Sequence, residues 1–311
     1  MRALVAWRDG FRRVASAPAL VVAAWLATTI VSLPFAVAIR GDIMRSLGTS
    51  TSADAAARGM NYEWMQEFGT HASGLATTFR PTIVGFAAVL DNLSAYLDGV
   101  QRPTAVAAAA VLYALCWAFL SGGVIERYAT RRTTRVPEFF SACGRYFGRF
   151  VRLEIATAIV SGGIVVFVHR WIFSTLYPRA VRDVGVERTA FLIRVAFYLV
   201  FVLALATANI VVDFAKVRAV LEDRRSMLMA IAASFRFIRR NAGTAVGVYL
   251  LNAAAFVLVL AAYSLVAPGG GGAGGMVWAA VLIGQAYITA RLCVRLLFFA
   301  TETALFQHRN D

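Results

Sequence analysis

The stretch AFLIRVAFYLVFVLALATANIVV, residues 190–212, contains one charged residue, Arg194. A helix needs about 20 mostly apolar residues to cross the hydrocarbon core of a membrane, which is about 30 Å thick. Within lipid, backbone polar groups can be satisfied only inside a helix or a closed barrel. A continuous apolar run without two-residue alternation favours the helix. Residues 190–212 are therefore predicted to form a transmembrane helix.

Five further stretches meet the same criterion, and the composition of the chain agrees with them. About 59% of the residues are hydrophobic and 15% are charged, against roughly 45–50% and 25% in soluble domains. The sequence predicts an all-α membrane protein with six transmembrane helices in a single integral membrane domain, residues 1–311. The first apolar stretch is longer than that of a signal peptide, so we expect it to be retained. The other predicted spans are residues 19–39, 104–124, 155–176, 245–266 and 276–299.

The arginines are distributed unevenly around these spans. Cytoplasmic loops of membrane proteins carry the excess of Lys and Arg. Arginine is frequent in the N-terminal tail and in segments 127–152 and 216–240, whereas residues 41–103 mix arginines with acids. We therefore expect both termini in the cytoplasm and residues 41–103 as an extracytoplasmic helical insertion between the first two spans. Residues 178–188, with three arginines, depart mildly from this pattern.

The net charge of +14 is then a signature of membrane orientation, and no nucleic-acid partner is expected. Nearly all the basic residues are arginine, and Lys216 is the single lysine. This usage is typical of GC-rich bacterial coding, so we expect a bacterial cytoplasmic (inner) membrane.

A short basic motif precedes the first, third and fifth spans. It reads WRDGFRR at residues 7–13, GRYFGRF at 144–150 and FRFIRRN at 235–241. Residues four apart share one helix face, so each motif predicts an amphipathic helix that lies on the membrane surface with its arginines toward anionic headgroups. The alternative is that any cytoplasmic flank of an arginine-rich membrane protein has this pattern. The predicted headgroup-binding residues are Arg8, Arg12, Arg145, Arg149, Arg236 and Arg240.

Because the motif recurs before every second span, the chain divides into three units, residues 1–126, 136–220 and 226–307. Each unit would hold one cytoplasmic interfacial helix followed by a transmembrane hairpin. Two runs of small residues, Ser121-Gly122-Gly123 and Ser161-Gly162-Gly163, favour close helix packing, because small side chains let helix backbones approach within lipid. The alternative is that these glycines are simply tolerated in a membrane helix.

A few polar residues fall within or beside the spans, where they are costly and are candidates for function. The predicted intramembrane polar residues are Arg291, Arg295, Asp213 and Asn252. Arginines near a membrane boundary can extend their side chains to the headgroups. The second interpretation pairs Arg291 with Asp213 or Glu126 at the inner end of the bundle.

The outer segment contains carboxylates and a histidine, the residue types of catalytic and metal sites. Glu63, Glu67 and His71 recur every four residues on a short helix predicted at 61–69, but Gly69 is expected to interrupt the turn. We therefore interpret them as a solvated helix face, and residues 82–97 as an amphipathic or re-entrant helix. The three cysteines have neither disulfide nor metal spacing. No catalytic residue, metal or cofactor is predicted.

Residues 212–226 and 233–241 resemble a group of uncharacterised multi-pass bacterial membrane proteins. The group includes the membrane domain fused to some glycerophosphodiester phosphodiesterases. The shared pattern is a spanning helix, an acidic-basic turn like residues 221–225, and then a helix rich in serine, phenylalanine and arginine. No phosphodiesterase catalytic domain is recognisable, so the resemblance does not imply that activity.

Three functions follow from this reading. The first is a non-enzymatic membrane protein that organises lipids or partner proteins, with anionic lipids as partners and a further protein or a second copy of the chain as an option. The second is a transporter or channel component, which needs a hydrated path lined by Arg291, Asn252 or Gln285. The third, least favoured, is a membrane enzyme that acts through Glu63, Glu67, His71 or Asp91 at the outer face.

Overall fold

The computed structural model describes residues 2–59, 61–79, 94, 95, 98, 104–267 and 275–310, and every element in these ranges is a helix. Six helical stretches are long and apolar enough to cross a membrane. Each of the six predicted spans lies inside one of them, apart from at most two residues at its start, as expected for a multi-pass membrane protein. The spanning elements are α2 (Pro18–Leu47), α6 (Thr104–Thr130), α7 (Val136–Gly163) with its continuation through η3 (Ile164–His169), η4 (Ile172–Leu176) and α8 (Tyr177–Ala180), α9 (Glu187–Leu221), α11 (Ala242–Val266) and α12 (Gly275–Asn310).

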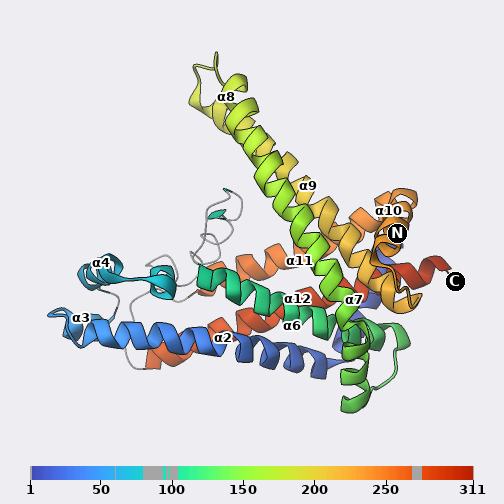
Figure 1. The fold of residues 1–311 in the computed structure, drawn as a ribbon, viewed down its shortest axis with the longest axis horizontal. Coiled ribbons are helices and arrows are strands. Elements are labelled where there is room, and N and C mark those ends of the chain that lie inside the picture. The colour runs from blue at the N-terminus through green and yellow to red at the C-terminus, as the bar shows by residue number, and fades with distance from the viewer. Residues whose placement is uncertain are drawn as a thin grey trace.

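The helices converge at one end of the molecule. Both termini and α10 (Met227–Arg240) lie at this end (Figure 1). We call it the basic end, because Arg12, Arg145 and Arg240 are exposed there. From it, α2, α6, α11 and α12 extend in one direction, while α7 and α9 form a hairpin that diverges from them (Figure 1).

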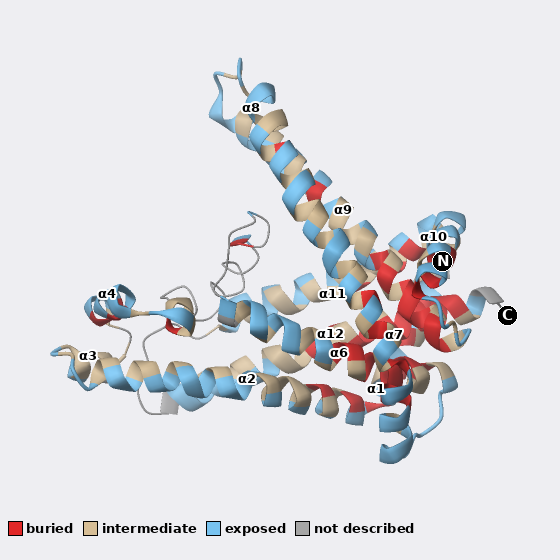
Figure 2. Ribbon diagram, in the orientation of Figure 1, coloured by how far each residue is buried: buried red, intermediate tan, exposed pale blue. Residues whose placement is uncertain are grey.

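Burial follows the same division. Buried residues gather at the basic end, and the far parts of the spans are mostly exposed (Figure 2). The main core there includes Ile125 of α6, Phe150 of α7 and Leu296 of α12. Farther out, large apolar side chains such as Ile159 and Leu258 are 70% exposed. Lipid is as apolar as these side chains, so their exposure is expected in a membrane protein.

Two short basic helices precede spans, as the repeat predicts. α1 (Arg2–Ala15) ends just before Pro18, which occupies the first turn of α2. Proline lacks the N–H of a helix interior but is compatible with a first turn. α10 is capped at its start by Ser226, whose side chain accepts a hydrogen bond from the Met229 N–H, and at its end by Asn241.

The third span differs from the expectation of a separate interfacial helix. α7 begins at Val136 and passes through Arg145 and Arg149 into the span without a break. The physical reason lies in the sequence, since residues 149–155 contain no proline, glycine or capping residue that would end a helix. The first turn of α7 packs instead against α6, where Phe139 contacts Gly123.

The outer segment also departs from the prediction in two places. α2 continues to Leu47, past the predicted end of the span at residue 39. α4 (Tyr62–His71) runs through Gly69, so this glycine does not interrupt the helix. Trp64, Met65 and Phe68 of α4 form a small separate core. α3 (Ala53–Ala57) and η1 (Gly74–Thr78) complete the described part. The helix predicted at 82–97 lies almost wholly outside the described residues.

Candidate functional site

Four arginines line a cavity of about 540 Å³ between α9 and α10. We call it the α9–α10 cavity. Its lining contains four arginines and no acidic residue. Two of these arginines, Arg236 and Arg240, belong to the predicted headgroup-binding set. The lining residues are Arg218, Arg224, Ala233, Arg236, Phe237, Arg240 and Asn241.

Two of the four arginines are held by the protein itself. Arg218 donates through Nη1 to the Ala233 carbonyl oxygen at 2.6 Å and through Nη2 to Glu222 Oε1 at 2.7 Å. Arg224 contacts the same carboxylate. Burial works to raise the pKa of Glu222, but its hydrogen bonds and its proximity to both guanidinium groups hold the pKa below its usual value. Glu222 therefore stays ionised and fixes Arg218 and Arg224 in place.

Arg236 and Arg240 remain available to a ligand. Both are exposed, and neither forms an ion pair with a carboxylate in the described residues. They lie one turn apart on the same face of α10. The helix is anchored on the bundle through buried Ala230 and Ala233, and Ala233 also lines the cavity. A rigid helix thus presents two free guanidinium groups at the edge of a basic cavity.

The second arginine pair is engaged differently. Arg149 Nη1 lies 2.6 Å from Asp223 Oδ1 and 3.3 Å from the Arg224 carbonyl oxygen. This hydrogen bond and the charge of Arg149 hold the pKa of Asp223 below its usual value. Arg145 is half exposed and lies 3.6 Å from Glu126 Oε2. These residues connect α7 to α6 and to the turn that follows α9, so less of their charge is free for headgroups.

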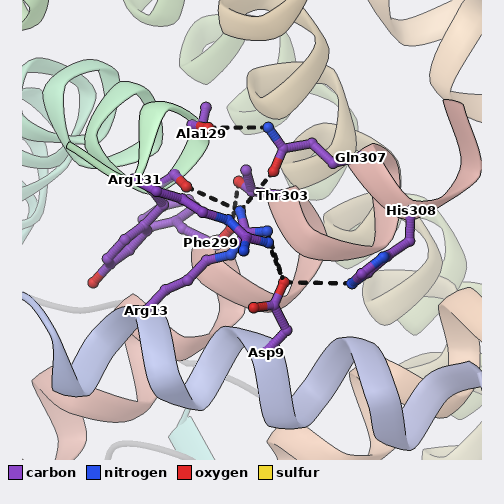
Figure 3. Close-up of polar contacts among 9 residues, drawn as sticks. Asp9, Arg13, Ala129, Arg131, Phe299, Thr303, Gln307 and His308 are labelled. Carbon is purple, nitrogen blue, oxygen red and sulfur yellow. Dashed lines mark hydrogen bonds and ion pairs between the residues drawn. The ribbon is translucent and has the colours of Figure 1, made fainter. Parts of the chain in front are cut away.

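The first pair, Arg8 and Arg12, is exposed on α1, while the neighbouring Arg13 is buried. Figure 3 shows Arg13 inserted between α6 and α12. Its guanidinium donates to the Tyr128 carbonyl oxygen at 2.9 Å, to Gln307 Oε1 at 2.8 Å and to Asp9 Oδ2 at 2.7 Å. Arg13 was not among the predicted residues, although Asp9 stands four residues before it.

Asp9 is the centre of this cluster (Figure 3). Its Oδ2 lies 2.7 Å from both Arg13 and Arg131 and 3.4 Å from His308 Nε2. Burial works to raise its pKa, but the hydrogen bond from Arg13 and the neighbouring positive charges outweigh burial, so the pKa lies below its usual value. The carboxylate ties α1 to the ends of α6 and α12.

Replacing Asp9 by asparagine should destabilise the protein by about 1–3 kcal/mol, because Arg13 is left buried without its carboxylate. The folded pKa of Asp9 is depressed, so the wild type gains stability from ionised Asp9 above the unfolded pKa of about 3.9 and loses it as the pH falls through the folded value. Asp9→Asn should remove this acid-side dependence. Thermal unfolding in detergent between pH 3 and 7 measures it, with exposed Asp54→Asn as the control. Equal unfolding temperatures for Asp9→Asn and wild type would contradict the assignment.

Of the predicted intramembrane polar residues, Asp213 lies in a charged cluster that the sequence did not predict. Lys216 Nζ lies 2.7 Å from Glu154 Oε1 of α7 and 3.8 Å from Asp213 Oδ1. Arg291 is exposed and pairs with neither Asp213 nor Glu126, so the second interpretation does not hold. The physical reason is that Asp213 already faces a lysine one turn along its own helix.

The other intramembrane residues also have specific contacts. Arg295 stacks on Trp117, with Cζ 3.9 Å from the ring centroid, and donates to Tyr113 Oη at 3.2 Å. Asn252 is fully buried and donates through Nδ2 to Thr301 Oγ1 at 2.8 Å. These contacts connect α12 to α6 and α11. They indicate a packing role, since each residue is taken up by a partner on another helix.

The outer cavity, of about 350 Å³, brings together only part of the proposed enzymatic set. Glu67 and His71 line it with Asp42 and Arg45, whereas Glu63 does not. Glu67 Oε2 accepts a hydrogen bond from Ser50 Oγ at 2.6 Å. Asp91 lies outside the described residues. Within the described ranges, no group of three His, Cys, Asp or Glu side chains could hold a metal ion.

No family model, curated protein or solved structure matches the chain.

Proposed function

We propose that the protein is a non-enzymatic multi-pass protein of a bacterial inner membrane that binds anionic phospholipid headgroups through the α9–α10 cavity. Arg236 and Arg240 would hold the phosphate. The basic end would face the cytoplasm with both termini, because Lys and Arg are in excess on that side of membrane proteins. Organisation of lipids at this surface, or of a protein partner or second copy recruited to it, is the role that we assign.

The observation that carries this proposal is the pair of free guanidinium groups in a cavity without an acidic lining residue. Guanidinium groups form short, charge-assisted hydrogen bonds with phosphate oxygens. The cytoplasmic leaflet is negatively charged, and each basic residue near it contributes about 1 kcal/mol of attraction.

The surroundings of the cavity support a lipid in particular. Leu228 and Phe235 of α10 are 76% and 53% exposed. An amphipathic helix with exposed apolar and basic residues lies in the membrane interface, with its apolar side chains among the acyl chains. Arg236 and Arg240 would then stand at the depth of the headgroups.

The test is stabilisation of the purified protein by added lipid. Short-chain phosphatidylglycerol should raise the unfolding temperature of the delipidated wild type in neutral detergent, and phosphatidylcholine of the same chain length should not. Arg236→Gln/Arg240→Gln should weaken the apparent affinity about tenfold or more, since two contacts of about 1 kcal/mol each are lost. Arg239→Gln is the matched control, because Arg239 is exposed on the same helix but does not line the cavity. Equal responses of the double variant and wild type would overturn the proposal.

A transporter or channel component is the second candidate. The observation that favours it is the cluster of buried Lys216 with the half-buried Glu154 and Asp213, since charged residues within membrane bundles often mark transport paths. Against it, Asn252 and Gln285 are hydrogen-bonded to Thr301 and Trp25.

The resemblance to the uncharacterised membrane proteins named above also stays a proposal. The residues that carry it, 212–226 and 233–241, correspond to the end of α9, the turn after it, and α10.

A further inference from the structure

Two adjoining cavities lie at the corner where the bend between α1 and α2 meets the end of α6 and the start of α7. The first, of about 530 Å³, has a polar lining that includes Arg127, Arg132 and Arg145. The second, of about 300 Å³, is mostly apolar. Both are lined by Arg127, Thr133, Thr134 and Phe139, so they meet at these residues. The apolar side chains of the second cavity include Pro18, Leu20, Ala23, Val136 and Phe140.

The apolar cavity follows α2 from Pro18 to Ala23 and lies against Phe139 and Phe140 of α7. Phe140 stacks on Phe119, with ring centroids 6.2 Å apart. Phe119 precedes Arg127 on α6 by eight residues, which corresponds to about 12 Å along a helix. Phe140 is 49% exposed, so the cavity is open at the protein surface. Its shape is thus a groove between α2 and α7 that begins beside a basic residue.

The polar cavity has positive charge available at the junction. Arg127 is half-buried there and forms no ion pair in the described part of the chain. The two acids of the lining are already engaged, because Glu126 lies beside Arg145 at 3.6 Å and Glu138 accepts the backbone N–H of Arg135 at 3.2 Å. Arg132 and the hydroxyl group of Thr133 add hydrogen-bond donors.

We propose that this corner is a second lipid site, separate from the α9–α10 cavity, that takes one anionic phospholipid of the inner leaflet. The phosphate binds at Arg127, and an acyl chain lies in the groove between Leu20 and Ala23 of α2 and Phe139 and Phe140 of α7. The polar cavity and the apolar groove together match the headgroup and the acyl chain of a whole lipid. A soluble phosphate would leave the apolar groove unused, and a neutral acyl compound would leave Arg127 without a partner.

The experiment is photo-crosslinking in phosphatidylcholine nanodiscs doped with phosphatidylglycerol that carries a diazirine midway along one acyl chain. Crosslinks should concentrate on residues 18–23 and 136–140. Ala23→Trp, which fills the groove, and Arg127→Gln, which removes the cation, should each reduce them severalfold. The matched controls are Ala110→Trp, at an exposed position of α6 outside this cavity, and Arg225→Gln, at an exposed arginine of the basic end outside both cavities.

Crosslinks spread over all lipid-exposed helices, or unchanged in both variants, would overturn the site. Equal labelling by phosphatidylcholine with the same diazirine would also overturn it, because the cation would then play no part. If Ala23→Trp fails to fold, Ala19→Trp on the rim of the groove replaces it. Arg236→Gln/Arg240→Gln should leave these crosslinks unchanged, so failure of this site is distinguishable from failure of the α9–α10 cavity.

Discussion

Replacing Lys216 by methionine should destabilise the protein by about 3–5 kcal/mol, the largest effect of any single substitution considered. Lys216 is buried between Glu154 of α7 and Asp213 of its own helix. Removing one partner of a buried ion pair leaves an uncompensated charge in a medium of low polarity. Glu302 of α12 is also buried, with an Oε2 atom that has no hydrogen-bond partner within the described structure. Lys216 thus supplies positive charge to a region where acids from three helices gather.

The measurement is the temperature at which the monodisperse peak of a fluorescently tagged protein is lost in size-exclusion chromatography. Lys216→Met should lower it strongly, and Lys216→Met/Glu154→Gln should recover part of the loss, because the unpaired carboxylate is removed with its partner. The control is Arg225→Gln, at an exposed position outside the cluster. If Lys216→Met loses its monodisperse peak at the same temperature as Arg225→Gln, the ion pair does not stabilise the bundle.

The second large effect should come from the contact between α6 and α7. A Cβ atom added at Gly123 would lie 2.7 Å from Cys143 Sγ and 2.7 Å from Phe139 Cε2. Such distances are far inside van der Waals contact, so Gly123→Leu must push the two helices apart. Overpacking of this kind costs about 1–3 kcal/mol or more.

The chain contains a matched control for this substitution. Gly162 occurs in the same Ser-Gly-Gly sequence, but a Cβ atom there would meet nothing within 4 Å. Gly162→Leu should therefore leave the unfolding temperature in detergent close to that of wild type, whereas Gly123→Leu lowers it by several degrees. Equal losses in the two variants would mean that the response reflects glycine replacement in any membrane helix and not packing against α7.

These glycines illustrate how much the sequence could predict. Apolar runs determine spanning helices locally, so the six spans could be located from the chain alone. Small-residue packing was correct for Gly122 and Gly123 but not for Gly162, because the same three letters stand on different faces relative to their neighbours. The face of a helix that packs against another helix is determined by residues distant in sequence. In a run that is apolar on all sides, the periodicity of the sequence does not show which face this is.

The polar contacts were the least predictable part. Two residues four apart in a helix share a face whatever the rest of the fold is, so the position of Arg236 and Arg240 on one face of α10 could be predicted from the sequence. Arg149 has an equivalent spacing, yet it pairs with Asp223, which is 74 residues away. Lys216 and Glu154 are likewise joined only by the fold. A signal was present, however, since the single lysine of an arginine-rich chain stands one turn after Asp213 at the end of a span.

The continuous α7 could have been foreseen. Pro18 and Asn241 stand where α1 and α10 end, and the corresponding position before the third span has no such residue. The repeat was read from the arginines, which mark charge, while helix ends are set by proline, glycine and capping side chains.

Binding of inner-leaflet lipid requires that the basic end of the six-span bundle face the cytoplasm, and the accessibility of engineered cysteines tests this orientation directly. Arg239→Cys lies at the basic end, and Gly185→Cys lies between α8 and α9 at the opposite end of the hairpin. Intact spheroplasts are treated with a membrane-impermeant maleimide before and after permeabilisation, with wild type as the baseline for Cys116, Cys143 and Cys293. We expect Gly185→Cys to react in intact cells and Arg239→Cys only after permeabilisation. Reaction of Arg239→Cys in intact cells, or protection of Gly185→Cys, would contradict the proposed orientation and, with it, the binding of inner-leaflet lipid.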